Sequence, residues 1–395
     1  MIQGLRQKLS RVSNQHFIPE IDGLRFLAIF LVILLHAKTT LFKEFSGVFD
    51  KKELLHNPLF YIIYHGDLGV KIFFSISGFI LAMPFSKAGR DKQPFPSLKN
   101  FYLRRLTRLE PPFILVMIGL FFVTGIQSNQ LNWDYFKHLL ASISYSHMFF
   151  YGYWSPINPV TWSLETEVQF YLLLPLFALV FRISKPSLRW GALLAFTVLL
   201  TLVSRNMDLA AFHLKKSLLS YWGFFSVGIL FADFYQTQFH VIRGKKSFLF
   251  DGIGILSFLL LFGKFDGFLD ESFRKIIQSF NFVWVLPLFF AVFRGRILSW
   301  FFTLPWIVIF GGMCYTIYLI HYPILFLIGQ RLSPVLGGDS PTFWGVYLPF
   351  LLIALPILAV VSSVFFIYFE KPFMYKDWPE RWALAIKSRF KKSNT

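Results

Sequence analysis

Cysteine is almost absent from the chain, because Cys314 is the only one among 395 residues. This scarcity excludes a disulfide framework and a zinc site built from cysteines. Charged residues are also few, at 15%, whereas 55% of the residues are hydrophobic, 20% are aromatic and the mean hydropathy is +0.55. No segment is long and polar enough to fold as a separate soluble domain. The composition therefore indicates one membrane domain with several spans.

Acidic residues are too few to balance the basic ones, since 21 Asp and Glu stand against 39 Lys and Arg, giving a net charge of +18. In a soluble protein such an excess would indicate nucleic-acid binding, but no basic domain interleaved with aromatic residues is present. The Lys and Arg residues gather mainly in alternate loops, as the positive-inside rule requires. We therefore predict a lipid bilayer as the partner, no nucleic acid, and both chain termini in the cytoplasm.

Apolar windows recur along the chain and predict an all-α, polytopic membrane protein with about ten transmembrane helices. We divide it into a cytoplasmic N-terminal segment (1–20), a membrane domain (21–373) and a basic cytoplasmic tail (374–395). Two shorter stretches, 135–152 and 298–311, are predicted to be interfacial, and the first of them is alternatively re-entrant. The predicted spans are 21–42, 66–86, 110–126, 162–181, 190–204, 217–235, 247–263, 277–293, 312–330 and 343–369.

The first predicted span, "IDGLRFLAIFLVILLHAK", carries two ionisable side chains, Arg25 and His36. At 100° and about 1.5 Å per helical residue, they lie on nearly the same face and about 16 Å apart. Ionisable residues within a membrane often mark a substrate or proton pathway. The simpler interpretation is that Arg25 extends to the interface and His36 bonds to a neighbouring helix. Histidine is also the side chain best suited to general-base catalysis near neutral pH.

Polar residues begin the second and fourth predicted spans. Asp67 and Lys71 have the i, i+4 spacing of an ion pair, which alone would explain them, and Ser77 follows where a helix could make polar contacts with its neighbours. Glu165 and Glu167 lie in the first turns of the fourth span, where negative charge is favourable. Because residues two apart on a helix point about 200° apart, only one of these glutamates can face a buried histidine.

Three arginines precede two prolines in "FYLRRLTRLEPPF": Arg104, Arg105 and Arg108. A positive cytoplasmic loop would account for them. Alternatively they form a phosphate clamp, because guanidinium groups bind phosphate in bidentate fashion. Coenzyme A fits such a clamp, since it has phosphates at one end and a long arm that ends in the thioester.

A second histidine, His321, lies near the middle of the ninth predicted span in "CYTIYLIHYPI", one helical turn after Tyr318. A buried histidine that bonds to the helix backbone is the simpler interpretation. A polar role for both residues in a substrate cavity remains open.

Six segments occur along the chain in a recognisable order: "IDGLRFLAIFLVILLHA", "GVKIFFSISGFILA", "FYLRRLTRLEPP", "TWSLETEVQFYLLLP", "YTIYLIHYPI" and "YFEKPF". Together they resemble the acyltransferase-3 family of membrane proteins. The resemblance implies a bacterial inner-membrane enzyme that moves an acyl group from cytoplasmic acetyl-CoA or another acyl-CoA to a hydroxyl of a surface or lipid-linked glycan, without a metal. It implies that His36 is catalytic, that Arg25 belongs to the same signature, and that Glu167, then Glu165, assists.

The resemblance further implies that the arginines of the third motif lie near the donor. Some family members carry an extracellular hydrolase-like domain after the last helix, and this sequence has only the short basic tail there, so we expect the membrane domain or a partner to complete the acceptor chemistry. The competing interpretation is a transporter or flippase, in which the same buried charges bind a substrate or relay protons. A scaffold protein of a glycan assembly complex is a third interpretation, and it would tolerate the loss of His36.

Overall fold

The computed structural model describes residues 7–12, 17–206, 212–263 and 271–375, together with residues 378 and 380. These residues form helices and no strand, which confirms the predicted all-α class of polytopic membrane protein. Within these described ranges, eight helical segments are long and apolar enough to cross a membrane. They are α2 (Pro19–Glu44), α5 (Leu68–Arg90), α6 (Leu98–Gln127), Pro159–Arg182 with α9 (Trp162–Phe177) at its centre, α10 (Pro186–Asn206), α12 (Leu218–Thr237), α19 (Cys314–Leu336), and Phe343–Met374, which begins with α20 (Phe343–Phe365).

The other two predicted spans, 247–263 and 277–293, correspond to shorter apolar helices. They are α14 (Phe248–Phe262) and the segment Asn281–Arg294, which contains η3 (Asn281–Trp284) and α16 (Val285–Arg294). The total of ten membrane crossings therefore stays a prediction, as does the cytoplasmic position of the termini. Most of the predicted tail, from residue 381 onward, lies outside the described residues.

Short helices connect the long ones. The stretch 135–152 is divided between α7 (Trp133–Ile143) and α8 (His147–Tyr151), and 298–311 between α17 (Arg296–Phe302) and α18 (Pro305–Gly312). The remaining short helices are α3 (Lys51–Leu54), α4 (Pro58–Tyr64), α11 (Phe212–Lys215), α13 (Phe239–Ile242), α15 (Glu271–Ser279), η1 (Pro159–Thr161), η2 (Ala178–Arg182), η4 (Phe366–Glu370) and η5 (Lys371–Met374).

The helix of the third predicted span is longer than the apolar window 110–126. Helix α6 begins at Leu98 and continues without interruption through Pro111 and Pro112. Proline removes one backbone donor, but membrane helices tolerate it where neighbouring groups satisfy the freed carbonyl. The arginines that precede the prolines therefore lie on the first turns of a long helix and not in a loop.

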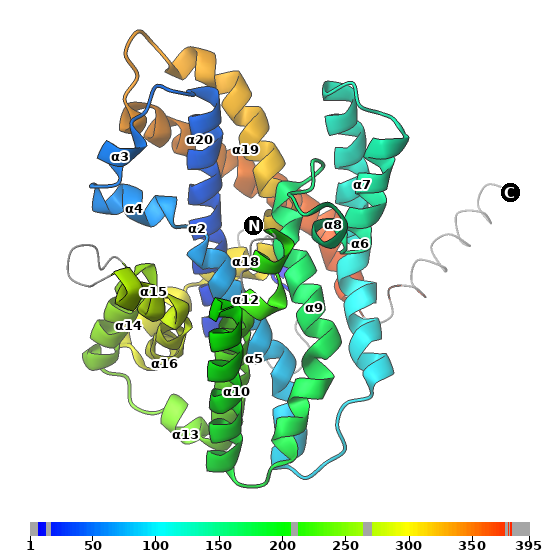
Figure 1. The fold of residues 1–395 in the computed structure, drawn as a ribbon, viewed down its shortest axis with the longest axis vertical. Helices are drawn as coiled ribbons and strands as arrows, with labels where there is room; N and C mark the ends of the chain where they lie inside the picture. The colour runs from blue at the N-terminus through cyan, green and yellow to red at the C-terminus, as the bar shows by residue number, and fades with distance from the viewer. Residues whose placement is uncertain are drawn as a thin grey trace, which may run out of the picture.

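Helix α5 lies in the lower half of the molecule, where α12 packs along it and α10 packs on α12 (Figure 1). Small residues allow its backbone to approach its neighbours closely. A Cβ atom added at Gly228 of α12 would lie 2.0 Å from the carbonyl oxygen of Ser75, and one at Gly69 would lie 2.1 Å from that of Ala28 on α2. Close approach through small residues is the usual way in which membrane helices pack.

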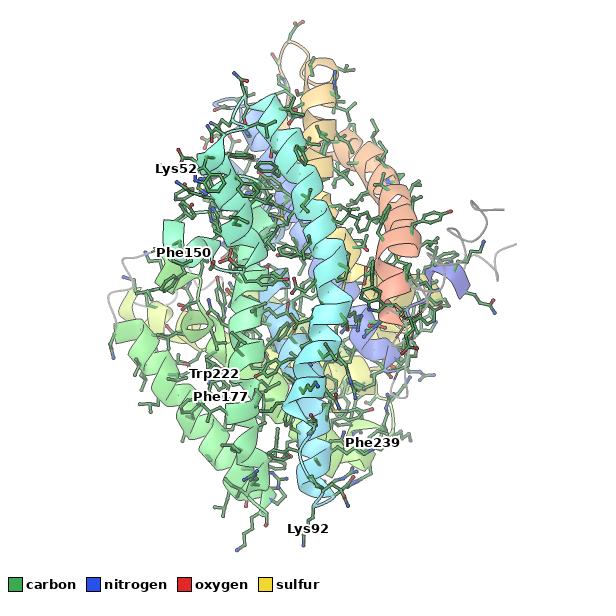
Figure 2. All side chains as sticks on the ribbon, turned by 90° about the vertical axis from the view of Figure 1, so that its right-hand side faces the viewer. Lys52, Lys92, Phe150, Phe177, Trp222 and Phe239 are labelled. Carbon is green, nitrogen blue, oxygen red and sulfur yellow. The ribbon has the colours of Figure 1, made fainter. Side chains whose placement is uncertain are left out.

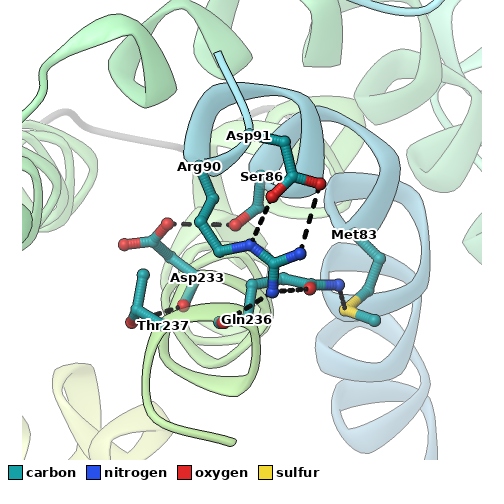
Figure 3. Close-up of polar contacts among 7 residues, drawn as sticks. All are labelled: Met83, Ser86, Arg90, Asp91, Asp233, Gln236 and Thr237. Atoms are coloured by element: carbon teal, nitrogen blue, oxygen red, sulfur yellow. Dashed lines mark hydrogen bonds and ion pairs between the residues drawn. The ribbon is translucent and has the colours of Figure 1, made fainter. Parts of the chain in front are cut away.

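Polar side chains add to this packing at the other end of α5, next to α12 (Figure 3). The hydroxyl of Ser86 donates to a carboxylate oxygen of Asp233 over 3.0 Å, and the guanidinium of Arg90 donates to the backbone oxygen of Gln236 over 2.9 Å. Asp233 also pairs with Arg189 of α10, with 3.0 Å between Arg189 Nη2 and the carboxylate. These contacts hold three helices in one register.

Apolar side chains fill the interior and also cover much of the outside. Phe177 and Trp222 lie together between helices, with 4.2 Å between their ring centroids, whereas Phe150 is 70% exposed (Figure 2). Lys52 of the short helix α3 lies in the upper part of the molecule (Figure 2). Lys92, just after α5, lies at the lower end. Such an apolar exterior suits lipid, and the charged ends suit water.

Candidate functional site

Four arginines from separate parts of the chain gather around buried carboxylates. We call Arg11, Arg25, Arg105 and Arg108 the arginine cluster. Asp22 accepts a hydrogen bond from Arg25 and lies 3.5 Å from the guanidinium of Arg11. The charge of Arg108 acts on Arg11, Arg25 and Arg105. The cluster therefore joins the N-terminal segment, α2 and α6 at one place.

Helical spacing accounts for two pairs within the cluster. Asp22 and Arg25 are three residues apart on α2, and Arg105 and Arg108 are three residues apart on α6, so each pair shares one helix face. Arg104 is four residues before Arg108 and so also near it on the helix, but its side chain is exposed. The structure thus brings together two of the three arginines that the sequence singled out, and Arg104 lies apart from them.

The two α6 arginines lack part of their hydrogen bonding. The Nε atoms of Arg105 and Arg108 are buried and have no partner among the described residues. Arg189 of α10 shows the contrast, because its guanidinium bonds to Asp233 and to the backbone oxygens of Ile183 and Ser184. A buried donor without a partner costs free energy unless something else accepts from it. Among the described residues, these two donors are therefore available to a further acceptor, such as an anionic ligand.

The charge balance of the cluster supports this conclusion. Arg11 lies outside the helical spans. The neighbouring guanidinium of Arg108 and, as a smaller cause, burial lower the pKa of Arg11 to about 9. The larger cause, repulsion from Arg108, shows that positive charges lie close together in the cluster. Glu370 of η4 offsets part of this charge, and it also accepts hydrogen bonds from the backbone N–H and the hydroxyl of Thr316.

The two glutamates of α9 lie in different surroundings. Glu167 accepts hydrogen bonds from the hydroxyls of Ser77 and Tyr171, and it interacts electrostatically with Arg25. Glu165 is buried and accepts from the backbone N–H of Met148 over 2.9 Å. Glu167 therefore belongs with the arginine cluster, whereas Glu165 holds α8 against α9. The side chains of Glu165 and Glu167 thus point in opposite directions, as expected for residues two apart on a helix.

His36 lies farther along α2 and faces α19. Its ring centroid is 5.1 Å from that of His321 and 5.2 Å from that of Tyr322. Nδ1 of His36 and Nε2 of His321 are both buried without a hydrogen-bond partner among the described residues. Two ring nitrogens without partners, on facing histidines, form a site that can accept and release protons.

Tyr318 and the Asp67–Lys71 pair complete the set of predicted residues. The Tyr318 hydroxyl donates to the backbone oxygen of Val160 over 2.6 Å and lies 3.1 Å from the Ser163 hydroxyl, so it joins α19 to α9. Asp67 and Lys71 form an ion pair of 2.9 Å at the start of α5. Both side chains are partly exposed, as expected for a pair at a helix end.

Several site residues were missed by sequence reasoning. Asp22 had a usable signal, since it precedes Arg25 by three residues. Glu370 lies within the "YFEKPF" motif, and Tyr171 lies one turn after Glu167. Tyr322 directly follows His321 in the ninth predicted span, whereas Arg11 had no distinguishing local signal. No group of three His, Cys, Asp or Glu residues in the described ranges could hold a metal ion.

Comparison with known proteins gives matches along most of the chain. A family model described as an acyltransferase domain matches residues 18–369. The peptidoglycan O-acetyltransferase OatA of Listeria monocytogenes serovar 1/2a is 28% identical over 371 residues, which cover 84% of this chain and 52% of that protein. A protein of Staphylococcus aureus strain COL, provisionally named an O-acetyltransferase, is 27% identical over 92% of this chain and 58% of its own length. The chain thus spans little more than half the length of these relatives. No solved structure matches it.

Proposed function

The chain belongs to the acyltransferase family whose model covers residues 18–369, and we propose that it is a multi-pass membrane O-acyltransferase. It takes an acyl group, most simply acetyl, from acyl-CoA on the cytoplasmic side and transfers it to a hydroxyl group of a cell-surface or lipid-linked glycan. The name of the Listeria relative favours an acetyl group and a glycan acceptor. The bacterial sources of the relatives favour a bacterial inner membrane.

The observation that carries this proposal is the pair of buried Nε donors of Arg105 and Arg108, for which the described part of the chain supplies no acceptor. Guanidinium groups bind phosphate oxygens through parallel hydrogen bonds, and CoA supplies phosphates. Its long pantetheine arm would extend from the arginine cluster along α2, whose residues Arg25 and His36 are about 16 Å apart along the helix. Arg104, exposed on α6, would contribute only long-range attraction.

His36 is the general base of the proposed reaction. Its imidazole accepts the proton of the acceptor hydroxyl while the hydroxyl oxygen attacks the thioester carbonyl carbon. The C–S bond breaks, the new C–O ester bond stays on the glycan, and the proton passes from the imidazolium to the sulfur of CoA. In a covalent variant of this route, an imidazole nitrogen takes the acyl group first and passes it to the hydroxyl in a second step.

The remaining residues have supporting roles in this proposal. Glu167 holds Arg25 and Ser77 in place beside the donor, and Glu165 fixes α8 over the site. Tyr318 keeps α19, and with it His321, at a fixed distance from α9. Asp67 and Lys71 lie on the side from which the acceptor approaches.

The test measures acyl transfer by the purified protein in lipid vesicles with radiolabelled acetyl-CoA and a cell-surface glycan extract. Wild type is expected to transfer label to glycan and to release CoA, whereas His36→Ala should lose at least about 100-fold, which is the lower range for removing a general base. His240→Ala is the matched control, because His240 is exposed on α13.

Near-normal transfer by a folded His36→Ala protein would contradict the assignment of His36. Uptake of glycan or lipid into the vesicles without consumption of acetyl-CoA would instead support a transporter, since transport does not use an acyl donor.

A further inference from the structure

A cavity of about 180 Å³ lies where α5, α10, α12 and α15 meet η3, apart from the arginine cluster. Gln278 at its edge is exposed, so the cavity opens to the molecular surface. Most of its wall is polar but uncharged. The lining residues used below are Lys71, Ser220, Tyr221, Gln278, Asn281 and Phe282.

The lining combines amide groups with flat rings. The side-chain amides of Gln278 and Asn281 make no hydrogen bond to any described residue, and each offers two donors and an acceptor. Tyr221 and Phe282 contribute ring faces, which pack against apolar C–H surfaces. A sugar ring presents this combination, since it carries hydroxyl and amide groups at its edge and C–H groups on its faces. An acyl chain would need an apolar wall, and a phosphate would need more cations.

An aromatic surface continues from the cavity. Lys216 donates a hydrogen bond to the Tyr221 hydroxyl over 3.2 Å, and its Nζ lies 4.4 Å from the ring centroid of Trp162. Trp154 packs on Trp162 with 5.6 Å between centroids and is 37% exposed. A glycan longer than one unit could therefore lie across the tryptophans next to the cavity.

The cavity also connects to the helix turn that carries His36. Lys71 in the cavity wall pairs with Asp67 over 2.9 Å. Gly66, the residue before Asp67, packs directly on α2, since a Cβ atom there would lie 2.8 Å from the Cβ of Leu35. Leu35 immediately precedes His36. The start of α5 therefore contacts both the cavity wall and this turn of α2.

We infer that this cavity is an acceptor subsite, which binds one N-acetylated monosaccharide unit while a neighbouring unit is acylated at His36. The volume supports one unit, because pockets for larger ligands have about 300–1,000 Å³. The free amides of Gln278 and Asn281 match the donor and acceptor of an N-acetyl group. The inference rests on the proposed function for the role of the bound glycan, but not for the binding itself.

The test uses the full chain in lipid nanodiscs and a soluble tetramer of β-1,4-linked N-acetylglucosamine as the probe. Binding of the tetramer is followed by tryptophan fluorescence without any acyl donor, and binding of CoA is measured separately. The double variant Gln278→Ala/Asn281→Ala should weaken tetramer binding at least tenfold and leave CoA affinity within twofold. The control is Gln93→Ala, an exposed amide after α5 at the lower end of the molecule.

Unchanged tetramer binding in the double variant, or no tetramer binding by wild type, would overturn the inference. An equal loss of CoA affinity would also overturn it, because the residues would then support the fold and not the glycan. If wild type binds the tetramer through these residues but never consumes acetyl-CoA, the proposed function fails while the glycan subsite stands.

Discussion

At the scale of single residues, the two facing histidines differ in what their ring nitrogens do. His321 Nδ1 lies 2.8 Å from the backbone oxygen of Tyr318 and 3.0 Å from that of Ile317. Carbonyl oxygens only accept, so Nδ1 carries the hydrogen and the neutral ring keeps a lone pair on Nε2. That nitrogen finds no hydrogen-bond partner in the described ranges, and it belongs to the ring that faces His36. His321 is therefore suited to position His36 or to stabilise its protonated form.

Replacing His321 with asparagine tests this role. Asparagine can keep a donor near the position of Nδ1 but has no group at the position of Nε2. We expect His321→Asn to lower kcat at least tenfold, about 1.4 kcal/mol in barrier, with little change in KM for acyl-CoA. Steady-state kinetics of the reconstituted protein checks this.

His65→Asn is the matched control, because His65 Nδ1 also bonds to a backbone oxygen, that of Tyr61, over 2.9 Å. An activity of His321→Asn that equals that of the control would show that His321 only fills space.

At the scale of elements, the contact between α5 and α12 depends on glycines at the crossing. Gly78 would bring a Cβ atom within 2.2 Å of the carbonyl oxygen of Phe225, and Gly228 would bring one within 2.6 Å of the backbone N of Phe79. The atoms in the way belong to backbones, which cannot move aside as flexible side chains do. Any side chain here must push the two helices apart.

Gly228→Ala should therefore destabilise the protein by about 1–3 kcal/mol, the range for overpacking a filled interior. Thermal unfolding of the detergent-solubilised protein measures this. Gly119→Ala on α6 should be neutral or slightly stabilising, since nothing lies within 4 Å of its added Cβ and alanine favours a helix. Equal melting temperatures for the two variants would refute the close crossing.

The short helices α7 and α8 are joined by a histidine pair. His138 Nδ1 lies 2.9 Å from His147 Nε2, and the pair packs on Tyr151. Burial lowers the pKa of His147 to about 4, with a further contribution from His138, and burial also lowers the pKa of His138. Both rings are therefore neutral at pH 7.

Acidification should loosen this unit. A histidine in the unfolded chain has a pKa of about 6.5, which is above its folded value. Between pH 6.5 and pH 4 the unfolded state therefore binds more protons than the folded state, and the folded state becomes less stable as the pH is lowered. The loss at α7 and α8 is at most about 3 kcal/mol. Limited proteolysis at residues 133–151, with a protease active at both pH 7 and pH 5, should be faster at pH 5.

His147→Phe should remove most of this pH dependence, whereas His240→Phe, at an exposed position, should keep it. A cleavage rate that is the same at both pH values in wild type would contradict the assignment.

At the scale of the whole molecule, the arginine cluster connects regions that are distant in the sequence. Arg11 precedes α2, Arg105 and Arg108 lie in the early turns of α6, and Glu370 follows α20. An anion bound there would touch several elements at once. Donor binding should therefore depend on the cluster and not on the total positive charge of the surface.

Exchanging each arginine for lysine keeps the charge but removes the planar guanidinium. Arg105→Lys and Arg108→Lys should each raise KM for acyl-CoA about tenfold, about 1.4 kcal/mol of binding free energy. Arg104→Lys should change it less than twofold, because Arg104 is exposed outside the cluster. Titration of CoA by calorimetry gives the same comparison without turnover, and equal effects of all three variants would argue against a clamp.

Much of the architecture could be predicted from the sequence because hydropathy is a local property. All ten predicted spans fall on apolar helical segments, and His36 and Arg25 lie on one helix, as their spacing required. Helix ends were harder to predict than spans, because an apolar window marks only the apolar part of a helix. Helix α6 begins at Leu98, ahead of the window 110–126, since its first turns carry the polar residues of the arginine motif. The short stretch 135–152 gave an ambiguous pattern, and the structure forms two helices there.

What the sequence alone determined is a helical membrane protein with the ordered motifs of an acyltransferase, because helix formation and motif spacing depend on neighbours in the chain. Only the tertiary structure decided which charges meet. It paired Glu167 with Ser77 and the arginine cluster, and it brought His321 to face His36. These contacts join α5 to α9 and α2 to α19. Such pairings depend on how whole helices pack, since burying a charge in a membrane is tolerated only where another helix supplies its partner.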